Sequence, residues 1–238
     1  MIINTFTPAW WIMFAVQIAL IIGIWLGLRS SEMAKKKKFM TGYWIFMVIF
    51  LIVYKFYLIV ISDYETSFLN ELPLNLCQVA SLIALPGILA DNKVLKSFSA
   101  FVGTMCSLMG LLMPVAGFYD IPLLSGNSIG FYGFHGLVFV QSVSLFTLGI
   151  YKPKAKDIPG VMILLAVFAL IAHGCNYLLR LGALPGANYF FTYDPEGNPI
   201  LLLLRKMIDI NYVYELPLII PIGLFFALIT LFFRKKKA

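Results

Sequence analysis

Charged residues are scarce in this sequence. Asp, Glu, Lys and Arg make up 12% of the 238 residues, hydrophobic residues make up 61%, and the mean hydropathy is +0.91. A chain of this composition has lipid, not water, as the solvent for most of its surface. The composition therefore excludes a soluble fold. It predicts an all-α polytopic membrane protein, with residues 1–238 forming a single membrane domain.

Cysteine and histidine are rare as well. The three cysteines, Cys77, Cys106 and Cys175, lie in or beside apolar runs, and no CxxC or zinc-type spacing occurs. These features argue against a disulfide framework and a zinc module, and no nucleotide-binding motif is present. We therefore expect no cofactor and no metal. One alternative stays open, a metal site of Cys77, His135 and His173, although no spacing selects for it.

Seven apolar runs have about the 20 residues that a helix needs to cross a hydrocarbon layer of roughly 30 Å. They cover residues 8–28, 43–61, 73–90, 97–119, 128–150, 159–179 and 216–233. The third run is short, and we expect its helix to begin at about Pro73. Residues 180–214 form a long connection whose apolar patch, Ile200–Leu204, predicts a helix lying on the membrane surface. A connection of this length is usually a lid, a binding loop or a disordered segment.

Basic residues set the expected orientation. With seven spans, 14 of the 18 Lys and Arg residues fall on one side of the membrane and eight of the 11 acidic residues on the other. The positive-inside rule then places the N-terminus outside and the C-terminus in the cytoplasm. The net charge of +7 belongs to short loops beside an anionic leaflet, so we expect no nucleic-acid partner.

Polar side chains within the predicted spans gather at one depth. Counting along the helices places Cys77, His135, His173 and Asn176 in the outer half of the membrane. Such residues are costly in lipid and usually face a cavity or a neighbouring helix. A thiol near a helix N-terminus, opposite an imidazole, can act as an acyl-accepting nucleophile. The pattern therefore permits nucleophilic catalysis by a Cys/His pair at this depth.

A second group of polar residues would support this chemistry. His173, Asn176 and Tyr177 share a helix face, with Arg180 one turn further on; they could supply an acid or base, an amide donor to an oxyanion, and a partner for lipid phosphate. Packing alone is the simpler interpretation for most such residues, and we assign Cys106 and Cys175 to it. Lys55 either extends to the interface or pairs with Glu71 or Glu215.

Short motifs occur in a recognisable order along the chain. They are Leu-Pro-Leu-Asn-Leu-Cys at 72–77, Gly-Phe-His-Gly at 133–136, Asn176-Tyr177 and Asn188-Tyr189. In these motifs, from about Asp63 to Phe233, the chain resembles the bacterial YwaF-like integral membrane family. That family is similar to eukaryotic transmembrane protein 164, a phospholipid acyltransferase with a Cys/His pair. More distantly it resembles membrane hydrolases of fatty-acid esters of hydroxy fatty acids, which use Thr and His.

The resemblance implies that Cys77 accepts the acyl group and that His135 is the general base. Many relatives have a histidine two residues before the cysteine; here that position is Asn75. Supporting or substrate-binding roles are expected for Glu71, Asn75, Gln78, His173, Asn176, Tyr177 and Arg180.

The sequence thus predicts a multi-pass acyltransferase of the bacterial plasma membrane, whose partners are membrane lipids that donate and accept acyl chains. Hydrolysis of lipid esters is an alternative outcome at the same site. Two other classes stay open: a lipid or small-molecule transporter or binding protein, and a scaffold in which the polar cluster only fixes helix packing. The acyl chain, headgroup, acceptor and oligomeric state are not specified.

Overall fold

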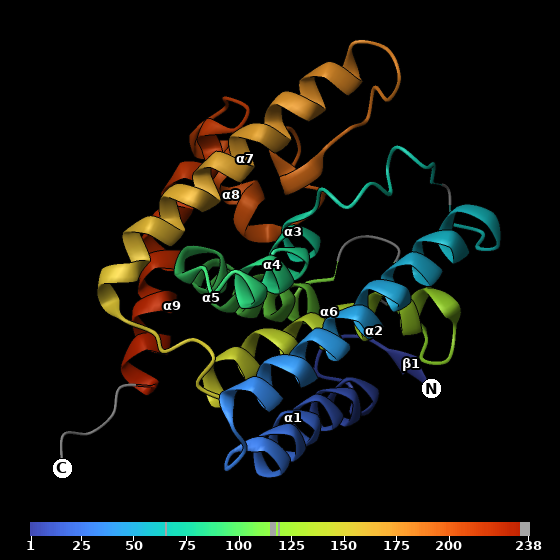
Figure 1. The fold of residues 1–238 in the computed structure, drawn as a ribbon. Coiled ribbons are helices and arrows are strands. Elements are labelled where there is room, and N and C mark those ends of the chain that lie inside the picture. Colours follow the sequence, from blue (N-terminus) through green and yellow to red (C-terminus); the bar gives the residue numbers. More distant parts are fainter. Residues whose placement is uncertain (65, 115–117, 119, 234–238) are drawn as a thin grey trace.

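The computed structural model describes residues 1–64, 66–114, 118 and 120–233, and it is mostly helical (Figure 1). Its α-helices are α1 (Pro8–Leu28), α2 (Met33–Val60), α3 (Leu76–Leu82), α4 (Ala84–Leu89), α5 (Lys93–Leu112), α6 (Gly126–Thr147), α7 (Ile158–Arg180), α8 (Pro199–Met207) and α9 (Ile219–Phe232). Short 3₁₀ helices are η1 (Ala155–Asp157), η2 (Tyr189–Phe191) and η3 (Val213–Leu218), and the strands are β1 (Ile2–Ile3) and β2 (Ile121–Pro122).

Within these residues, six helical stretches are long and apolar enough to cross a membrane. They are Pro8–Leu28, Met33–Val60, Lys93–Leu112, Gly126–Thr147, Ala155–Arg180 and Val213–Phe232. Each corresponds to one of the predicted apolar runs. The protein is therefore a multi-pass helical membrane protein, as the composition predicts.

The remaining run, residues 73–90, corrects the prediction in detail. It forms two short helices, α3 and α4, which adjoin at Ile83 and together cover Leu76–Leu89. The first begins at Leu76, not at Pro73, because Asn75 takes an extended N-cap conformation (φ −71°, ψ 149°). The Gln78 side chain then accepts a hydrogen bond from the Asn75 N–H at 3.3 Å, as in a capping box. Cys77 consequently lies in the first turn.

Other boundaries differ from the predicted runs where polar residues continue a helix. The second helix starts at Met33 instead of residue 43, because the run Lys35–Lys38 consists of good helix formers. The Ile200–Leu204 patch lies within α8, which Asn198 caps. The end of the 97–119 run, Glu65 and the basic tail Arg234–Lys237 lie wholly or partly outside the described residues.

Helices α5 and α6 form the centre of the molecule, and most of their residues are buried. Small residues allow this close packing. A Cβ added at Gly103 of α5 would lie 2.1 Å from the Ser142 Oγ of α6, and one at Gly130 would lie 1.9 Å from the Tyr54 ring of α2. In Figure 1, α7, α8 and α9 lie on one side of this centre and α1 and α2 on the other.

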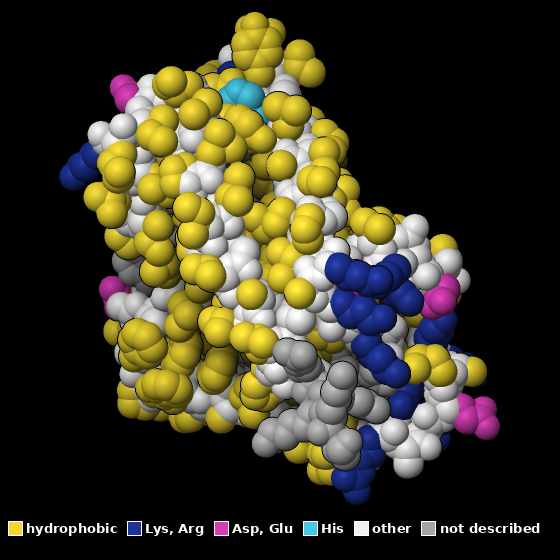
Figure 2. All heavy atoms as spheres, turned by 90° about the vertical axis from the view of Figure 1, so that its left-hand side faces the viewer, with side chains coloured by type: hydrophobic (Ala, Val, Ile, Leu, Met, Phe, Trp, Pro, Cys, Tyr) yellow, Lys and Arg dark blue, Asp and Glu magenta, His cyan; other side chains and the backbone are white. Residues whose placement is uncertain are grey.

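Ion pairs link the start of α2, the connection between α4 and α5, and the segment before α7 at one end of the molecule. Asp91, just after α4, accepts from Lys37 Nζ at 2.9 Å and from Lys96 Nζ at 2.8 Å. Lys93, at the start of α5, pairs with Asp157 before α7. Figure 2 shows Lys and Arg side chains gathered at one end of a face that is otherwise largely apolar. We refer to this as the basic end.

The N-terminal segment is attached to the opposite end of the helices. Strand β1 pairs antiparallel with β2, which precedes α6, with Ile3 opposite Ile121. The indole N–H of buried Trp10 donates to the Leu111 carbonyl at the end of α5, at 2.7 Å. These contacts hold the start of α1 against the connection between α5 and α6.

Candidate active site

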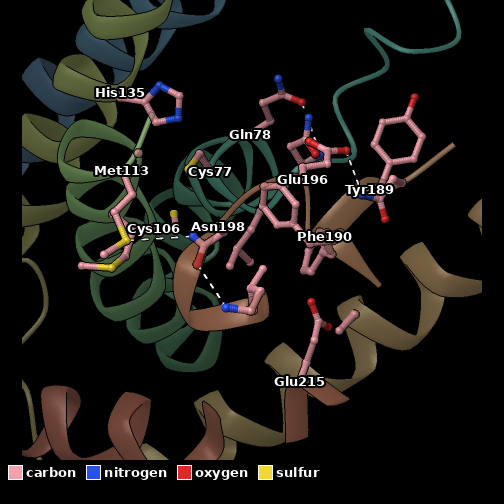
Figure 3. A pocket seen from close by; sticks show the side chains of 18 of the residues that line it. Cys77, Gln78, Cys106, Met113, His135, Tyr189, Phe190, Glu196, Asn198 and Glu215 are labelled. Carbon is pink, nitrogen blue, oxygen red and sulfur yellow. Dashed lines mark hydrogen bonds between the residues drawn. The ribbon is translucent and has the colours of Figure 1, made fainter. Parts of the chain in front are cut away.

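A cavity of about 1280 Å³ lies between the central helices, α7, α9 and the 184–201 connection. It exceeds the roughly 300–1,000 Å³ that is usual for a site binding a drug-sized ligand. Figure 3 shows Cys77, Cys106 and His135 toward one side of it, and Tyr189, Glu196 and Glu215 toward the other. Space of this size is sufficient for part of a lipid.

Cys77 lies where α3 begins, so its side chain projects from the first turn into the cavity. The thiol is free and half-buried. It lies against two ionisable side chains from other helices, the His135 imidazole of α6 and the Cys106 thiol of α5. Three helices therefore contribute one reactive side chain each.

Two contacts fix the His135 ring. Its Nδ1 lies 2.8 Å from the Phe131 carbonyl one turn earlier, and the ring packs on that of Phe131 with centroids 4.3 Å apart. Because a carbonyl only accepts, Nδ1 carries the proton of the neutral ring and Nε2 keeps the lone pair. This is the tautomer in which Nε2 can take a proton from the neighbouring thiol.

Gly110 of α5 makes room for the imidazole. A Cβ at this position would lie 2.6 Å from His135 Nε2 and 2.3 Å from Cδ2, both too short for any contact. Only glycine therefore allows the ring to lie against α5 in its present orientation.

Sequence reasoning assigned Cys106 to packing, and the structure shows that it packs in the hydrophobic core and also lines the cavity. It is buried, its Sγ lies 3.6 Å from the Gly103 carbonyl, and it lines the cavity beside Cys77. The sequence did contain a signal, because Cys106 and Gly110 are four residues apart and share a face of α5 with the cavity-lining Met105 and Met109.

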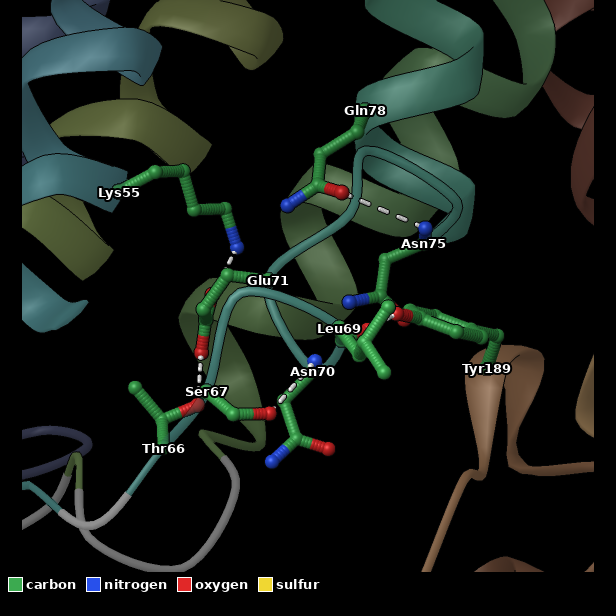
Figure 4. A network of polar contacts seen from close by, with 9 residues as sticks. All are labelled: Lys55, Thr66, Ser67, Leu69, Asn70, Glu71, Asn75, Gln78 and Tyr189. Carbon is green, nitrogen blue, oxygen red and sulfur yellow. Dashed lines mark hydrogen bonds and ion pairs between the residues drawn. The ribbon is translucent and has the colours of Figure 1, made fainter. Parts of the chain in front are cut away.

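A second polar network borders the cavity where α2 faces the segment before α3 (Figure 4). Lys55, the costly charge within α2, pairs with Glu71, which also accepts from the Thr66 hydroxyl at 2.8 Å. The structure thus selects Glu71 over Glu215 among the partners considered for this lysine. Asn75 and Gln78 also line the cavity here.

The polar face of α7 lies elsewhere and holds the outer connection. Asn176 is fully buried; its amide group donates to the Tyr189 carbonyl at 2.8 Å and to Thr192 Oγ1 at 2.9 Å. Its oxygen accepts from the Tyr189 N–H at 2.8 Å. Both N–H groups of this amide are thus engaged, which leaves none for an oxyanion.

His173 shares this arrangement. Its Nδ1 lies 3.1 Å from Thr192 Oγ1, and its ring stacks on Tyr193 at 4.7 Å. The Arg180 guanidinium also lies over the Tyr193 ring, 4.3 Å from its centroid. The Arg180 Nε donates to the Ala187 carbonyl at 2.7 Å. Tyr177 is 56% exposed on the helix surface.

The sequence predicts a similar depth for the two histidines, but the structure does not bring them together. His173, Asn176, Tyr177 and Arg180 are absent from the described lining of the cavity, because they lie on faces of α7 turned toward the loop or outward. The metal site that required His173 beside Cys77 and His135 does not form, and no group of three potential ligands occurs among the residues that the structure describes.

Fold and cavity together define a class: a polytopic helical membrane protein with a thiol and an imidazole in one large internal cavity. The chain also matches the model of the TMEM164 family over residues 5–233, nearly its whole length. It therefore belongs to the TMEM164 family, as the motif resemblance predicts. No curated protein and no solved structure matches it significantly.

Proposed function

We propose that this protein is a membrane acyltransferase that carries a lipid acyl chain as a thioester on Cys77. One observation supports this most strongly. A thiol and an imidazole from different helices lie together in a cavity that is large enough for lipid and apolar along much of its wall.

In the first half-reaction, His135 Nε2 takes the proton of the Cys77 thiol. The sulfur attacks the ester carbonyl of a lipid, and the leaving alcohol recovers the proton from His135, which leaves an acyl thioester. In the second half-reaction, His135 takes the proton of an acceptor hydroxyl. The acceptor oxygen attacks the thioester carbonyl, the acyl chain moves to it, and Cys77 regains its proton. Water as acceptor would give hydrolysis instead.

We further propose seven crossings, with Leu76–Leu89 as a short third crossing, the N-terminus outside and the cavity opening toward the outer leaflet. The ion pairs that Asp91 makes with Lys37 and Lys96, and that Asp157 makes with Lys93, support this arrangement, because they gather three connections on one side. The plasma membrane is the expected location, since its cytoplasmic leaflet is anionic.

The test is the intact mass of protein purified from native membranes, with and without neutral hydroxylamine. A hydroxylamine-labile fatty-acyl adduct should map to Cys77, vanish in Cys77→Ser and form more slowly in His135→Ala. Cys175→Ser is the matched control: Cys175 is a half-buried free thiol absent from the described cavity lining, and its variant should acylate normally.

A free Cys77 thiol that gains no adduct after incubation with mixed phospholipids would contradict acyl transfer. The same cavity would then serve a binding or transport protein.

A further inference from the structure

We propose that the part of the cavity between α5, α7 and α9 holds the acyl chain, and that Ala166 and Ala169 of α7 set the length of chain it accepts. We call this part the acyl arm. This inference rests on the proposed thioester at Cys77 and names the part of the site that receives the chain.

The two parts of the cavity differ in chemistry. Its polar lining residues come from α2, the 64–78 segment, the 188–198 loop and the 212–215 segment, with His135 from α6. The residues that α5, α7 and α9 contribute are Met, Leu, Ile, Ala, Pro, Phe and Gly, with Cys106 beside the nucleophile. A lipid has the same division, since its ester and headgroup are polar and its chain is apolar. The apolar part is therefore the place for the chain.

The α7 wall is a single helix face. Met162, Leu165, Ala166 and Ala169 line the cavity with spacing i, i+3, i+4 and i+7. Opposite them, Met105 and Met109 of α5 follow the same face as Cys106. Methionine is unbranched and adapts to irregular shapes, so this wall can follow a flexible chain.

The α7 wall of the arm runs toward the basic end, because α7 begins next to Asp157 there. Phe168, next to Ala169, contacts Phe98 with ring centroids 5.3 Å apart. Phe98 lies eight residues, or about 12 Å, before Cys106 along α5, whose start is at the basic end. Residues 169 to 162 continue in that direction for about 10 Å along α7.

Two large side chains, one from α7 and one from α9, belong to the apolar lining of the arm. Met162 of α7 and Phe225 of α9 line the cavity and also pack against the hydrophobic core cluster. Ala166 and Ala169 lie about one and two turns beyond Met162 on the same face of α7, and their small side chains leave this part of the cavity open. Enlarging either one should therefore shorten the arm without touching Cys77.

The experiment uses purified full-length protein and p-nitrophenyl esters of 4-, 8- and 16-carbon acids, which carry no headgroup. Loading of Cys77 is followed by intact mass with hydroxylamine release. Wild-type protein should load all three, whereas Ala169→Val, Ala169→Leu and Ala169→Phe should progressively lose the longest donors. Each methylene kept out of the arm weakens binding about fourfold. Ala169→Phe should therefore lower the ratio of 16-carbon to 4-carbon loading by at least tenfold.

Leu170→Phe is the matched control, because Leu170 is 58% exposed and absent from the described cavity lining. Its donor profile should equal that of wild type. A wild-type profile across the whole Ala169 series would overturn the acyl arm. If Ala169→Phe loads no donor at all, the same series at Ala166 decides, and an unchanged profile there overturns it. Failure of wild-type protein to load any ester would instead contradict the proposed thioester.

Discussion

His135 and His173 are the two histidines of the chain, and both lie in apolar helices at similar predicted depth, but their surroundings differ. His135 uses one ring nitrogen to hold itself on Phe131 and presents the other to a thiol. His173 binds Thr192 and stacks on Tyr193, within a cluster that fastens a loop. We call these the cavity cluster (Cys77, Cys106, His135) and the loop cluster (His173, Asn176, Arg180).

The difference concerns hydrogen-bond partners. In the loop cluster the Asn176 amide has no donor left, so it can only support structure. In the cavity cluster an imidazole nitrogen and a thiol face each other beside empty space. A polar residue within a membrane protein is a candidate for chemistry when its partners leave it a free atom and access to a ligand.

The largest expected effect separates the two histidines directly. His135→Ala removes the proposed base and should slow acylation of Cys77 by about 10²- to 10⁴-fold. His173→Ala should change this rate less than about tenfold, because its ring only holds the loop. Both rates can be measured by intact mass with a 4-carbon ester donor. Equal losses in the two variants would erase the distinction between the clusters.

A glycine beside each histidine gives a sharper comparison. Gly110→Ala would force the His135 ring away from α5, since the new Cβ would lie 2.6 Å from Nε2. We expect acylation to fall at least about tenfold while the protein stays folded, because a misplaced base loses its geometry. Gly174→Ala, next to His173, has open space within 4 Å and should keep the wild-type rate.

Substitutions in the loop cluster should lower the stability of the fold. Asn176→Leu leaves the buried Tyr189 N–H and carbonyl without their partner, which should lower the free energy of unfolding by about 3 kcal/mol. Denaturation in detergent, followed by Trp fluorescence, measures this. Exposed Tyr177, the next residue, provides the control as Tyr177→Phe, which should unfold like wild type. An unchanged Asn176→Leu would show that the loop is held by other contacts.

The smallest effect lies at the basic end, remote from both clusters. Hydrogen bonds from Lys96 and Lys37 lower the pKa of Asp91 to about 2. A carboxyl with a lowered pKa stabilises the fold above its unfolded pKa and loses that contribution as pH falls through its folded pKa. Stability should therefore decline slightly between about pH 4 and pH 2 in wild type and less in Asp91→Asn. Asn also tolerates the φ of +50° found here. Identical pH profiles would argue against these ion pairs in solution.

The sequence predicted the class of protein and most of the long apolar helices well. The apolar runs place the first helix at residues 8–28 as observed, and the family motifs agree with the family match. Hydropathy and helix rise give position along the membrane normal, and that is also why Cys77 and His135 could be expected at one depth.

The sequence did not predict how each helix is rotated about its own axis. Depth alone grouped His173 with Cys77, and composition alone did not place Cys106 at the cavity, because neither states which way a side chain points. The start of α3 was misplaced at Pro73 because the Asn75–Gln78 cap competes with the proline signal. Only tertiary contacts, such as that between Asn176 and Tyr189, decide these angles.

The pairing of β1 with β2 also sets an order of events during synthesis. Ile3 can meet Ile121 only after 118 further residues have been made, which takes roughly 6 to 24 seconds at about 5–20 residues per second. The acceptor for Trp10, the Leu111 carbonyl, appears only slightly earlier. Helix α1 is thus made before α5 and α6, yet its N-terminal end is held in place only after α5 and the start of α6 have been made. Until then its inner face is open to any membrane chaperone that recognises an unpaired helix.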